Sequence, residues 1–149
     1  MSEEPKWMIV DSGIFLASVQ KERFGKEVDR LLASLREANF QLAAPTLLRY
    51  ELIAVVRKNV YRKSIAPSDA RVIQEAINEL TDEITFFIDD DLLKRGYAIA
   101  EQLSLATAYD SQYLSVAERL HCDFWTADER LFNAVKQNLN WVHWIGQPI

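Results

Sequence analysis

The chain of 149 residues is 49% hydrophobic and 26% charged, and it has only four glycines and four prolines. This composition excludes a disordered chain and predicts one globular domain over residues 1–149, with little room for a second. The net charge of −5 argues against a uniformly basic surface for nucleic acid, and the single cysteine, Cys122, cannot form an internal disulfide.

No stretch of the sequence approaches the roughly 18–20 continuous apolar residues that a membrane helix needs. The segment from Met1 to Lys6 is polar and acidic, unlike the start of a secretion signal. A lone cysteine fits a reducing compartment. We therefore expect a cytoplasmic protein without a membrane segment.

Short apolar runs alternate with longer amphipathic segments. The runs are brief, and most are rich in β-branched or aromatic residues, so they predict strands at Trp7–Val10, Gln41–Ala44, Thr85–Ile88, Phe124–Thr126 and Trp141–Ile145. The intervening segments predict helices over Ile14–Val19, Lys26–Ala38, Pro45–Val60, Asp69–Leu80, Asp91–Leu103, Asp110–Leu120 and Glu129–Asn138. Pro45 suits the first turn of its helix and Ser68 suits an N-cap. This alternation predicts an α/β fold with a parallel sheet covered on both faces.

Two acids follow predicted strands, where ligands of open parallel sheets bind. Asp11 comes directly after the first strand, and Asp128 comes shortly after the fourth. Both have a purely structural interpretation as well. Asp11 or Ser12 can cap the next helix, and Thr126 with Glu129 matches a capping box.

Glu51 occupies an unexpected place on its predicted helix. A helical projection puts it among Leu47, Leu48, Ala54 and Val55, on the stripe that should face the interior. An unpaired buried carboxylate is costly and tends to take up a proton. The sequence therefore leaves two alternatives, a buried ion pair with Lys or Arg, or the border of a metal pocket.

Asp110 repeats this pattern, because it is in register with the apolar residues Tyr113 and Leu114 of its own helix. Its structural alternative is a helix-start acid favoured by the macrodipole, with Thr107 as the cap. Neighbouring carboxylates stay ionised together only if cations compensate their charge. Taken together, the acids predict one metal-binding pocket made of Asp11, Glu51, Asp110 and Asp128.

At these residues the sequence resembles the PIN-domain nucleases. The segments that carry the resemblance, in order and spacing, are Val10–Ser12, Leu48–Leu52, Ala108–Tyr113 and Trp125–Leu131. The resemblance implies a three-layer α/β/α sandwich with a five-stranded parallel sheet of order 3-2-1-4-5. The first and fourth strands are then neighbours, which brings Asp11 and Asp128 side by side.

Length and layout further resemble the VapC-type toxin ribonucleases of bacterial toxin–antitoxin pairs. That resemblance implies cleavage of RNA (tRNA or rRNA) with Mg²⁺ or Mn²⁺, a homodimer, and inhibition by a small antitoxin protein. Ser12 and Thr126 are then expected to hydrogen-bond to the metal-binding carboxylates or to water. Gly13 stands where the family more often has asparagine or another polar residue, and we expect it to ease the turn into the helix.

A basic strip lies between residues 45 and 66 of this acidic chain. The side chains that we expect to contact RNA phosphates are Arg57, Lys58, Arg62 and Lys63. The alternative is an ordinary solvated helix face. A second candidate patch, with the same alternative, consists of Lys21, Arg23 and Lys26.

Three other functions compete with a nuclease. A receiver domain would need an aspartate such as Asp89 after its central strand, and a lysine near Trp141–Ile145 that the sequence lacks. A phosphate-transfer hydrolase would need an aspartate where Gly13 stands. A catalytically inactive PIN-like module that binds RNA or protein stays open.

Overall fold

A computed structural model describes residues 3–20 and 23–147 of the chain. One parallel sheet has the strand order β3-β2-β1-β4-β5. The strands are β1 (Lys6–Val10), β2 (Phe40–Pro45), β3 (Ile84–Phe87), β4 (Asp123–Thr126) and β5 (Val142–Trp144). This order confirms the expected topology, and it differs from the 2-1-3-4-5 order of receiver-type sheets.

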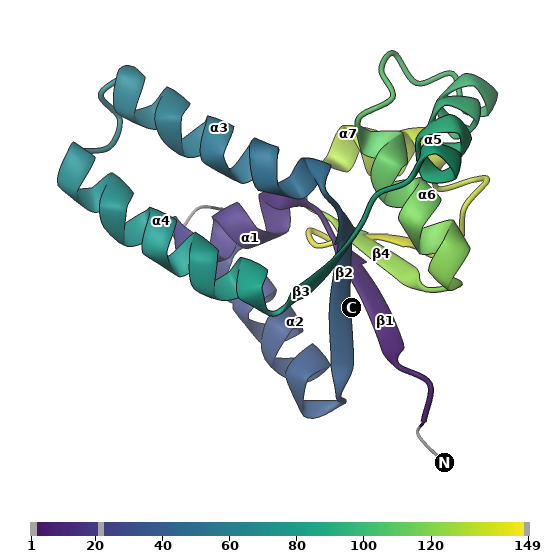
Figure 1. The fold of residues 1–149 in the computed structure, drawn as a ribbon, viewed down its shortest axis with the longest axis horizontal. Helices are drawn as coiled ribbons and strands as arrows, with labels where there is room; N and C mark the ends of the chain where they lie inside the picture. Colours follow the sequence, from purple (N-terminus) through teal and green to yellow (C-terminus); the bar gives the residue numbers. More distant parts are fainter. Residues whose placement is uncertain (1–2, 21–22, 148–149) are drawn as a thin grey trace.

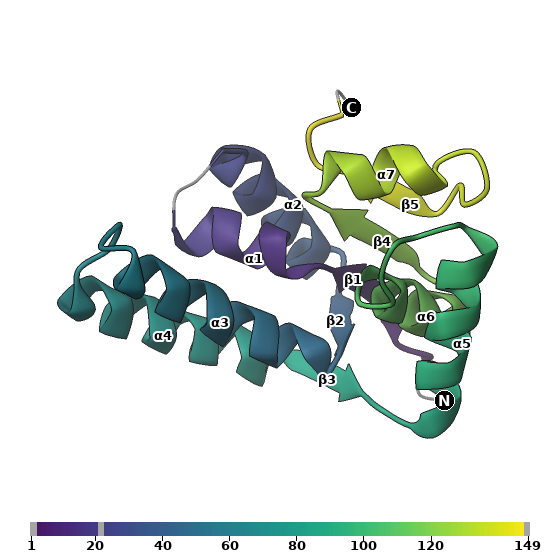
Figure 2. The same cartoon turned by 90° about the horizontal axis from the view of Figure 1, so that it is seen from above.

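Helices cover both faces of the sheet (Figures 1 and 2). On one face lie α1 (Ser12–Val19) and α2 (Gly25–Glu37), with α7 (Glu129–Val135) beside β5. On the other face lie α5 (Asp90–Gln102) and α6 (Asp110–Leu120). The two remaining helices, α3 (Leu47–Tyr61) and α4 (Pro67–Asp82), form a hairpin that projects from the sheet. The fold is therefore the expected three-layer sandwich with one protruding arm.

The sequence of β1 is a continuous apolar run because the strand is buried on both faces of the sheet. Ile9 and Val10 are both fully enclosed, because helices cover the two faces toward which successive side chains point. On the α6 face, the buried ring of Tyr113 stacks on that of Phe124, with 5.7 Å between centroids. This packing fixes α6 against β4 in the centre of the sheet.

Two predicted helix starts are wrong. Pro45 ends β2, where it pairs with Phe87, and α3 begins only at Leu47. At the last position of a strand a missing N–H removes little of the ladder. The N-cap of α4 is Ala66, with Pro67 in the first turn, so proline and not Ser68 sets this helix start. The other predicted elements are present, with ends shifted by a few residues.

No helix within the described ranges is both long enough and apolar enough to cross a membrane.

Candidate metal centre

The fold brings the four predicted acids to the carboxyl edge of the sheet. Asp11 follows β1 and Asp128 follows β4, and these two strands are hydrogen-bonded neighbours. The Asp11 N–H donates to the carbonyl of Trp125 at 3.2 Å, which extends the strand pairing to the acid itself. Glu51 lies in the first half of α3, and Asp110 is the first residue of α6.

Asp11 accepts hydrogen bonds on both carboxylate oxygens. The Thr126 hydroxyl donates to Oδ2, while the backbone N–H groups of Ile14 (3.1 Å) and Ala127 (3.4 Å) donate to Oδ1. Asp11 is thus also the N-cap of α1. Burial raises the pKa of Asp11 to about 6, against the opposing effect of these hydrogen bonds, and the negative charge of Asp110 raises it further. Asp11 therefore caps α1, as its structural interpretation predicts, and its carboxylate is at the same time buried at the carboxyl edge of the sheet.

Thr126 connects Asp11 with Asp128. Its fully buried hydroxyl donates to Asp11 and accepts from the backbone N–H of Asp128 at 2.9 Å. The carboxylate of Asp128 in turn caps α7, where it accepts from the N–H groups of Arg130 and Leu131 at 2.9 and 3.2 Å. The predicted capping box of Thr126 and Glu129 is therefore wrong, because Asp128 is the cap and Thr126 faces Asp11.

Ser12 differs from Thr126 in its contacts. It is the first residue of α1 and is half-buried. Within the described part of the chain its hydroxyl forms no hydrogen bond with another residue. Its predicted contact with a carboxylate is therefore not made in this structure.

Glu51 lies beside the buried stripe of α3. The interior positions are Leu48, Leu52 and Val56, and Glu51 is half-buried at the edge of that stripe. The Tyr113 hydroxyl donates to its Oε1 at 2.5 Å. Burial raises the pKa of Glu51, the Tyr113 hydrogen bond opposes that effect, and the charge of Asp110 adds to it. The partner of Glu51 is therefore a tyrosine, and not the Lys or Arg of the buried ion pair that the sequence analysis considered.

Asp110 is the least satisfied of the four acids. Within residues 3–20 and 23–147 its carboxylate accepts no hydrogen bond, and the N-cap of α6 is Tyr109 without a capping side chain, not Thr107. Burial and the charge of Asp128 raise the pKa of Asp110. Since the charge of Asp110 also raises the pKa values of Asp11 and Glu51, it lies electrostatically at the centre of the group.

The four acids together carry uncompensated negative charge. In the described ranges none of them pairs with a lysine or arginine, and the ion pairs present involve other acids. The described residues also contain no group of three or more His, Cys, Asp or Glu side chains already arranged to hold a metal ion. Mg²⁺ prefers oxygen ligands and keeps several of its waters. The four acids therefore fit a hydrated divalent cation in charge and donor type, and a closer fit needs movement of the side chains.

Gly13 is needed for space and not for a turn. No glycine in the described residues has a positive φ, so the predicted role of Gly13 in easing the turn is wrong. A Cβ at this position would lie 2.9 Å from the Cβ of Ala127 and 3.4 Å from Oδ1 of Asp11. The start of α1 therefore packs directly against the loop that follows β4.

Asp89, the acid that a receiver domain would require, is otherwise engaged. It caps α5 and pairs with Arg119 at 2.5 Å, and this hydrogen bond lowers the pKa of Asp89 to about 2.

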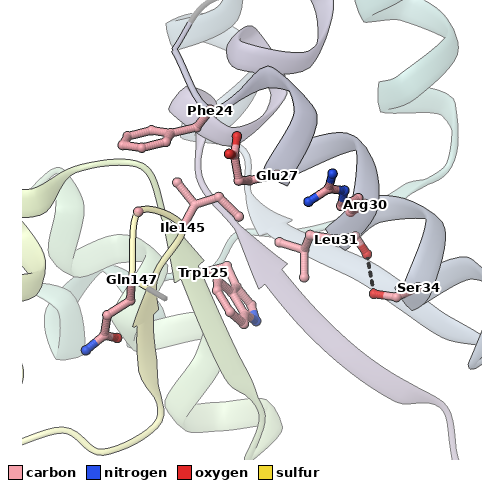
Figure 3. A pocket seen from close by; sticks show the side chains of 9 residues that line it. Phe24, Glu27, Arg30, Leu31, Ser34, Trp125, Ile145 and Gln147 are labelled. Atoms are coloured by element: carbon pink, nitrogen blue, oxygen red, sulfur yellow. Dashed lines mark hydrogen bonds between the residues drawn. The ribbon is translucent and has the colours of Figure 1, made fainter. Parts of the chain in front are cut away.

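A cavity of about 610 Å³ lies elsewhere, between α2 and the segment that follows β5 (Figure 3). Leu31, Trp125 and Ile145 point into it, and Glu27 and Arg30 stand along α2. None of the four acids lines this cavity. The acidic group at the sheet edge and this apolar groove are therefore separate features.

The predicted basic residues lie on the projecting arm. All four, Arg57, Lys58, Arg62 and Lys63, are exposed on the far half of α3 and the turn after it. In the second candidate patch, Lys21 lies outside the described residues. Arg23 lies over the ring of Phe24, 4.5 Å from its centroid, and Lys26 is exposed.

Comparisons with known proteins agree with this architecture. The family model of the PIN domain matches residues 8–137. The crystal structure of PAE2754 from Pyrobaculum aerophilum is similar in fold, with a TM-score of 0.65 and 18% sequence identity over 91% of each chain. A comparison with curated proteins found no match. PIN domains are generally nucleases and typically use divalent metal ions. Because the family match spans most of the sequence, the chain belongs to the PIN-domain family.

Proposed function

We propose that this protein is a Mg²⁺-dependent endoribonuclease whose metal site consists of Asp11, Glu51, Asp110 and Asp128. The observation that carries the proposal is Asp110, a half-buried carboxylate without a hydrogen bond in the described chain, whose charge acts on Asp11 and Glu51. Such a group of acids is stable at neutral pH only with a compensating cation. Mn²⁺ is the alternative metal.

The residues have different parts in this proposal. Asp11, Glu51 and Asp110 would hold Mg²⁺ directly or through water, and Asp128 would help to bind it or a second ion. When bound, the metal supplies orientation of the scissile phosphate and a lower pKa for an attacking water. Thr126 holds Asp11 in position and Tyr113 holds Glu51, because each donates a hydrogen bond to a carboxylate oxygen. Ser12 is a further candidate to hydrogen-bond to a metal-bound water.

RNA is the substrate that the charges favour. Arg57, Lys58, Arg62 and Lys63 supply a positive potential on a chain that is otherwise acidic, and phosphate contacts of this kind position RNA without reading its sequence. We infer tRNA or rRNA as the target from the resemblance to toxin ribonucleases.

The toxin role extends this proposal. A small antitoxin as its inhibitor and a homodimer as its assembly follow from the same resemblance. The cytoplasm as its compartment follows from the lone cysteine, Cys122. Two neighbouring exposed apolar side chains, Ile88 (67% exposed) after β3 and Leu93 (48% exposed) on α5, support a dimer, since a partner commonly covers a contiguous apolar patch.

A second function has one observation in its favour. Because the described acids are not arranged to hold a metal ion, the chain also fits an inactive PIN-like module that binds RNA or protein. The two functions differ in whether RNA is cleaved.

The test uses total tRNA incubated with the purified protein in Mg²⁺, in Mn²⁺ and in EDTA. We expect cleavage with the metals, none in EDTA, and none with the Asp11→Asn variant. The matched control is Asp91→Asn, which removes the same charge from an exposed position on α5 and should cleave like the wild type. Cleavage in EDTA, or by Asp11→Asn at the wild-type rate, contradicts the proposed site. Binding without cleavage across varied RNAs and metals supports the inactive module.

A further inference from the structure

One face of α3 carries both a proposed metal-binding acid and two of the exposed cations. Lys58 and Arg62 follow Glu51 by seven and eleven positions. At 3.6 residues per turn, both lie within about 20° of Glu51 around the helix axis, and about 10 and 16 Å further along it. Arg57, the neighbour of Lys58, lies about 120° away from Glu51. We call the line of Glu51, Lys58 and Arg62 the α3 face.

The cations of the α3 face are available for a ligand. Some arginines elsewhere are engaged by acids, as Arg95 is by Glu118 at 2.7 Å and Arg119 by Asp89 at 2.5 Å. In residues 3–20 and 23–147 neither Lys58 nor Arg62 forms such a pair, and both side chains are exposed. Lys58 and Arg62 lie in line with the acidic group, which itself contains no lysine or arginine. They are therefore placed to bind successive phosphates of a strand whose scissile phosphate lies at the metal.

An aromatic side chain accompanies these cations. Tyr61 is 77% exposed at the end of α3. It lies one turn beyond Lys58 and about 80° around the helix from Glu51, between the α3 face and Arg57. Its ring does not contribute to the core, so packing does not explain its position. Exposed aromatic rings beside cations are typical platforms for unpaired bases, which stack on them whatever their identity. The bases of a duplex are already stacked on one another and cannot use such a platform.

The shape of the arm gives the ligand a path. The hairpin of α3 and α4 projects from the sheet, with the Glu51 end at the sheet and the Arg62 end far from it (Figures 1 and 2). A stacked strand advances about 3.4 Å per nucleotide. The phosphate about three nucleotides from the scissile bond would therefore reach Lys58, and the phosphate about five nucleotides from it would reach Arg62.

We propose that the α3 face binds a single-stranded flank on one side of the scissile bond. Lys58 and Arg62 contact successive phosphates of that flank, and Tyr61 stacks on one of its bases. Arg57 lies beyond Tyr61, about 100° around the helix from Lys58, so it is further than Lys58 and Arg62 from phosphates in line with Glu51 and contributes less to their binding. This inference rests on the proposed nuclease function for its reference point, the bond held at the acids.

Binding of labelled RNA tests the inference without cleavage. Fluorescein-labelled oligouridylates of 2, 4, 6, 8 and 12 nucleotides, and a 12-base-pair RNA duplex, are titrated with the full chain in Ca²⁺ without Mg²⁺, and anisotropy is measured. We expect the affinity to rise with length up to about six nucleotides and then level off, and the duplex to bind more weakly than the 12-mer.

Matched variants separate the α3 face from general attraction. Lys58→Gln and Arg62→Gln should each weaken the 8-mer about fivefold and lower the slope of log affinity against log salt by about 0.7. Arg57→Gln removes the same charge one residue away and should change the 8-mer less than about twofold. Tyr61→Ala should also weaken the 8-mer about fivefold, whereas the dinucleotide should bind all variants alike.

Three results overturn the inference: no RNA binding by the wild type, an equal loss for Arg57→Gln and Lys58→Gln, or duplex binding as tight as that of the single strand. The proposed nuclease function fails separately. If binding depends on RNA length and on Lys58 and Arg62, but no metal-dependent cleavage occurs, the RNA-binding role of the α3 face is supported and the nuclease proposal is contradicted. If metal-dependent cleavage occurs but binding does not depend on RNA length, the nuclease proposal is supported and the role of the α3 face is contradicted.

Discussion

The hydroxyl of Tyr113 donates a 2.5 Å hydrogen bond to Glu51, although 62 positions separate the two residues. The Tyr113 ring is fully buried and stacks on Phe124, so the core of the sheet fixes the position of the donor. A donor held in place by packing orients the carboxylate that it contacts. The position of Glu51 therefore depends on the packing of α6 against the sheet as well as on α3.

Replacement of Tyr113 by phenylalanine should weaken metal binding. Without the hydroxyl, the pKa of Glu51 rises further, since burial and Asp110 still act on it. A hydrogen bond to a charged group contributes about 1.5–3 kcal/mol to stability, and we expect a loss at the lower end of that range because Glu51 is only half-buried. The Mg²⁺ concentration for half-maximal cleavage should increase several-fold. Tyr97→Phe, at an exposed position, is the control, and an unchanged Mg²⁺ requirement in Tyr113→Phe would show that this contact does not serve the site.

Valine and serine at position 126 should behave differently. Thr126→Val removes both the donor to Asp11 and the acceptor for the Asp128 N–H, and it leaves two partly buried polar groups without these partners. We expect a loss of about 1–3 kcal/mol in the free energy of unfolding and at least tenfold slower cleavage. Thr126→Ser keeps the hydroxyl and should retain most activity. Equal activity of the two variants would rule out the hydroxyl as the important group.

The metal-free protein should become less stable as the pH rises from about 4 to about 6. The pKa of Asp11 is about 6 in the folded chain, against 3.8 for an aspartate exposed to water, so the folded state holds this proton more tightly than the unfolded state. The free energy of unfolding then falls with pH across that window, by about 3 kcal/mol for this group at about 1.4 kcal/mol per pH unit.

Asp11→Asn isolates this contribution. In EDTA the variant should match the wild type near pH 4 and exceed its stability above pH 6, as measured by urea unfolding at a series of pH values. At pH 7 Mg²⁺ should raise the melting temperature of the wild type and leave that of the variant unchanged. A stability difference that is constant with pH would contradict the raised pKa of Asp11.

Gly13→Ala should destabilise the fold, and a second substitution should reverse the effect. The new Cβ would lie 2.9 Å from that of Ala127, closer than two carbons pack, so the start of α1 and the loop after β4 must separate. Overpacking of this kind costs about 1–3 kcal/mol. Ala127→Gly in the same chain removes the opposing atom. The prediction fails if urea unfolding shows no recovery in the double variant relative to Gly13→Ala.

Asn and Ala at position 128 should separate helix capping from metal binding. Asn caps helices about as well as Asp, so Asp128→Asn should keep the stability of the wild type within a few tenths of a kcal/mol. Asp128→Ala should lose about 1 kcal/mol with the cap. If the charge of Asp128 serves the metal, both variants should cleave RNA at least tenfold more slowly. If Asp128→Asn keeps full activity, Asp128 serves only as the cap of α7 and not in metal binding.

The sequence by itself determined the order of elements and the edge at which the acids meet. The apolar run of β1 is short and continuous because both faces of a parallel strand are buried, and that local pattern is visible without a structure. Asp11 and Asp128 follow strands, so the topology of a parallel sheet alone carries them to its carboxyl edge. These features depend on periodicity and chain order, which the amino acids display directly.

Only the tertiary structure decided which partners the acids have. Arg119 pairs with Asp89 and Arg95 with Glu118, whereas Glu51 receives its hydrogen bond from Tyr113. Thr126 likewise donates to an acid 115 positions away, although its own neighbours suggested a capping box. Hydrogen bonds and ion pairs act over a few ångströms, so they depend on distances between segments that local sequence patterns do not encode. The tertiary structure therefore decides whether lysine or arginine side chains pair with the four carboxylates.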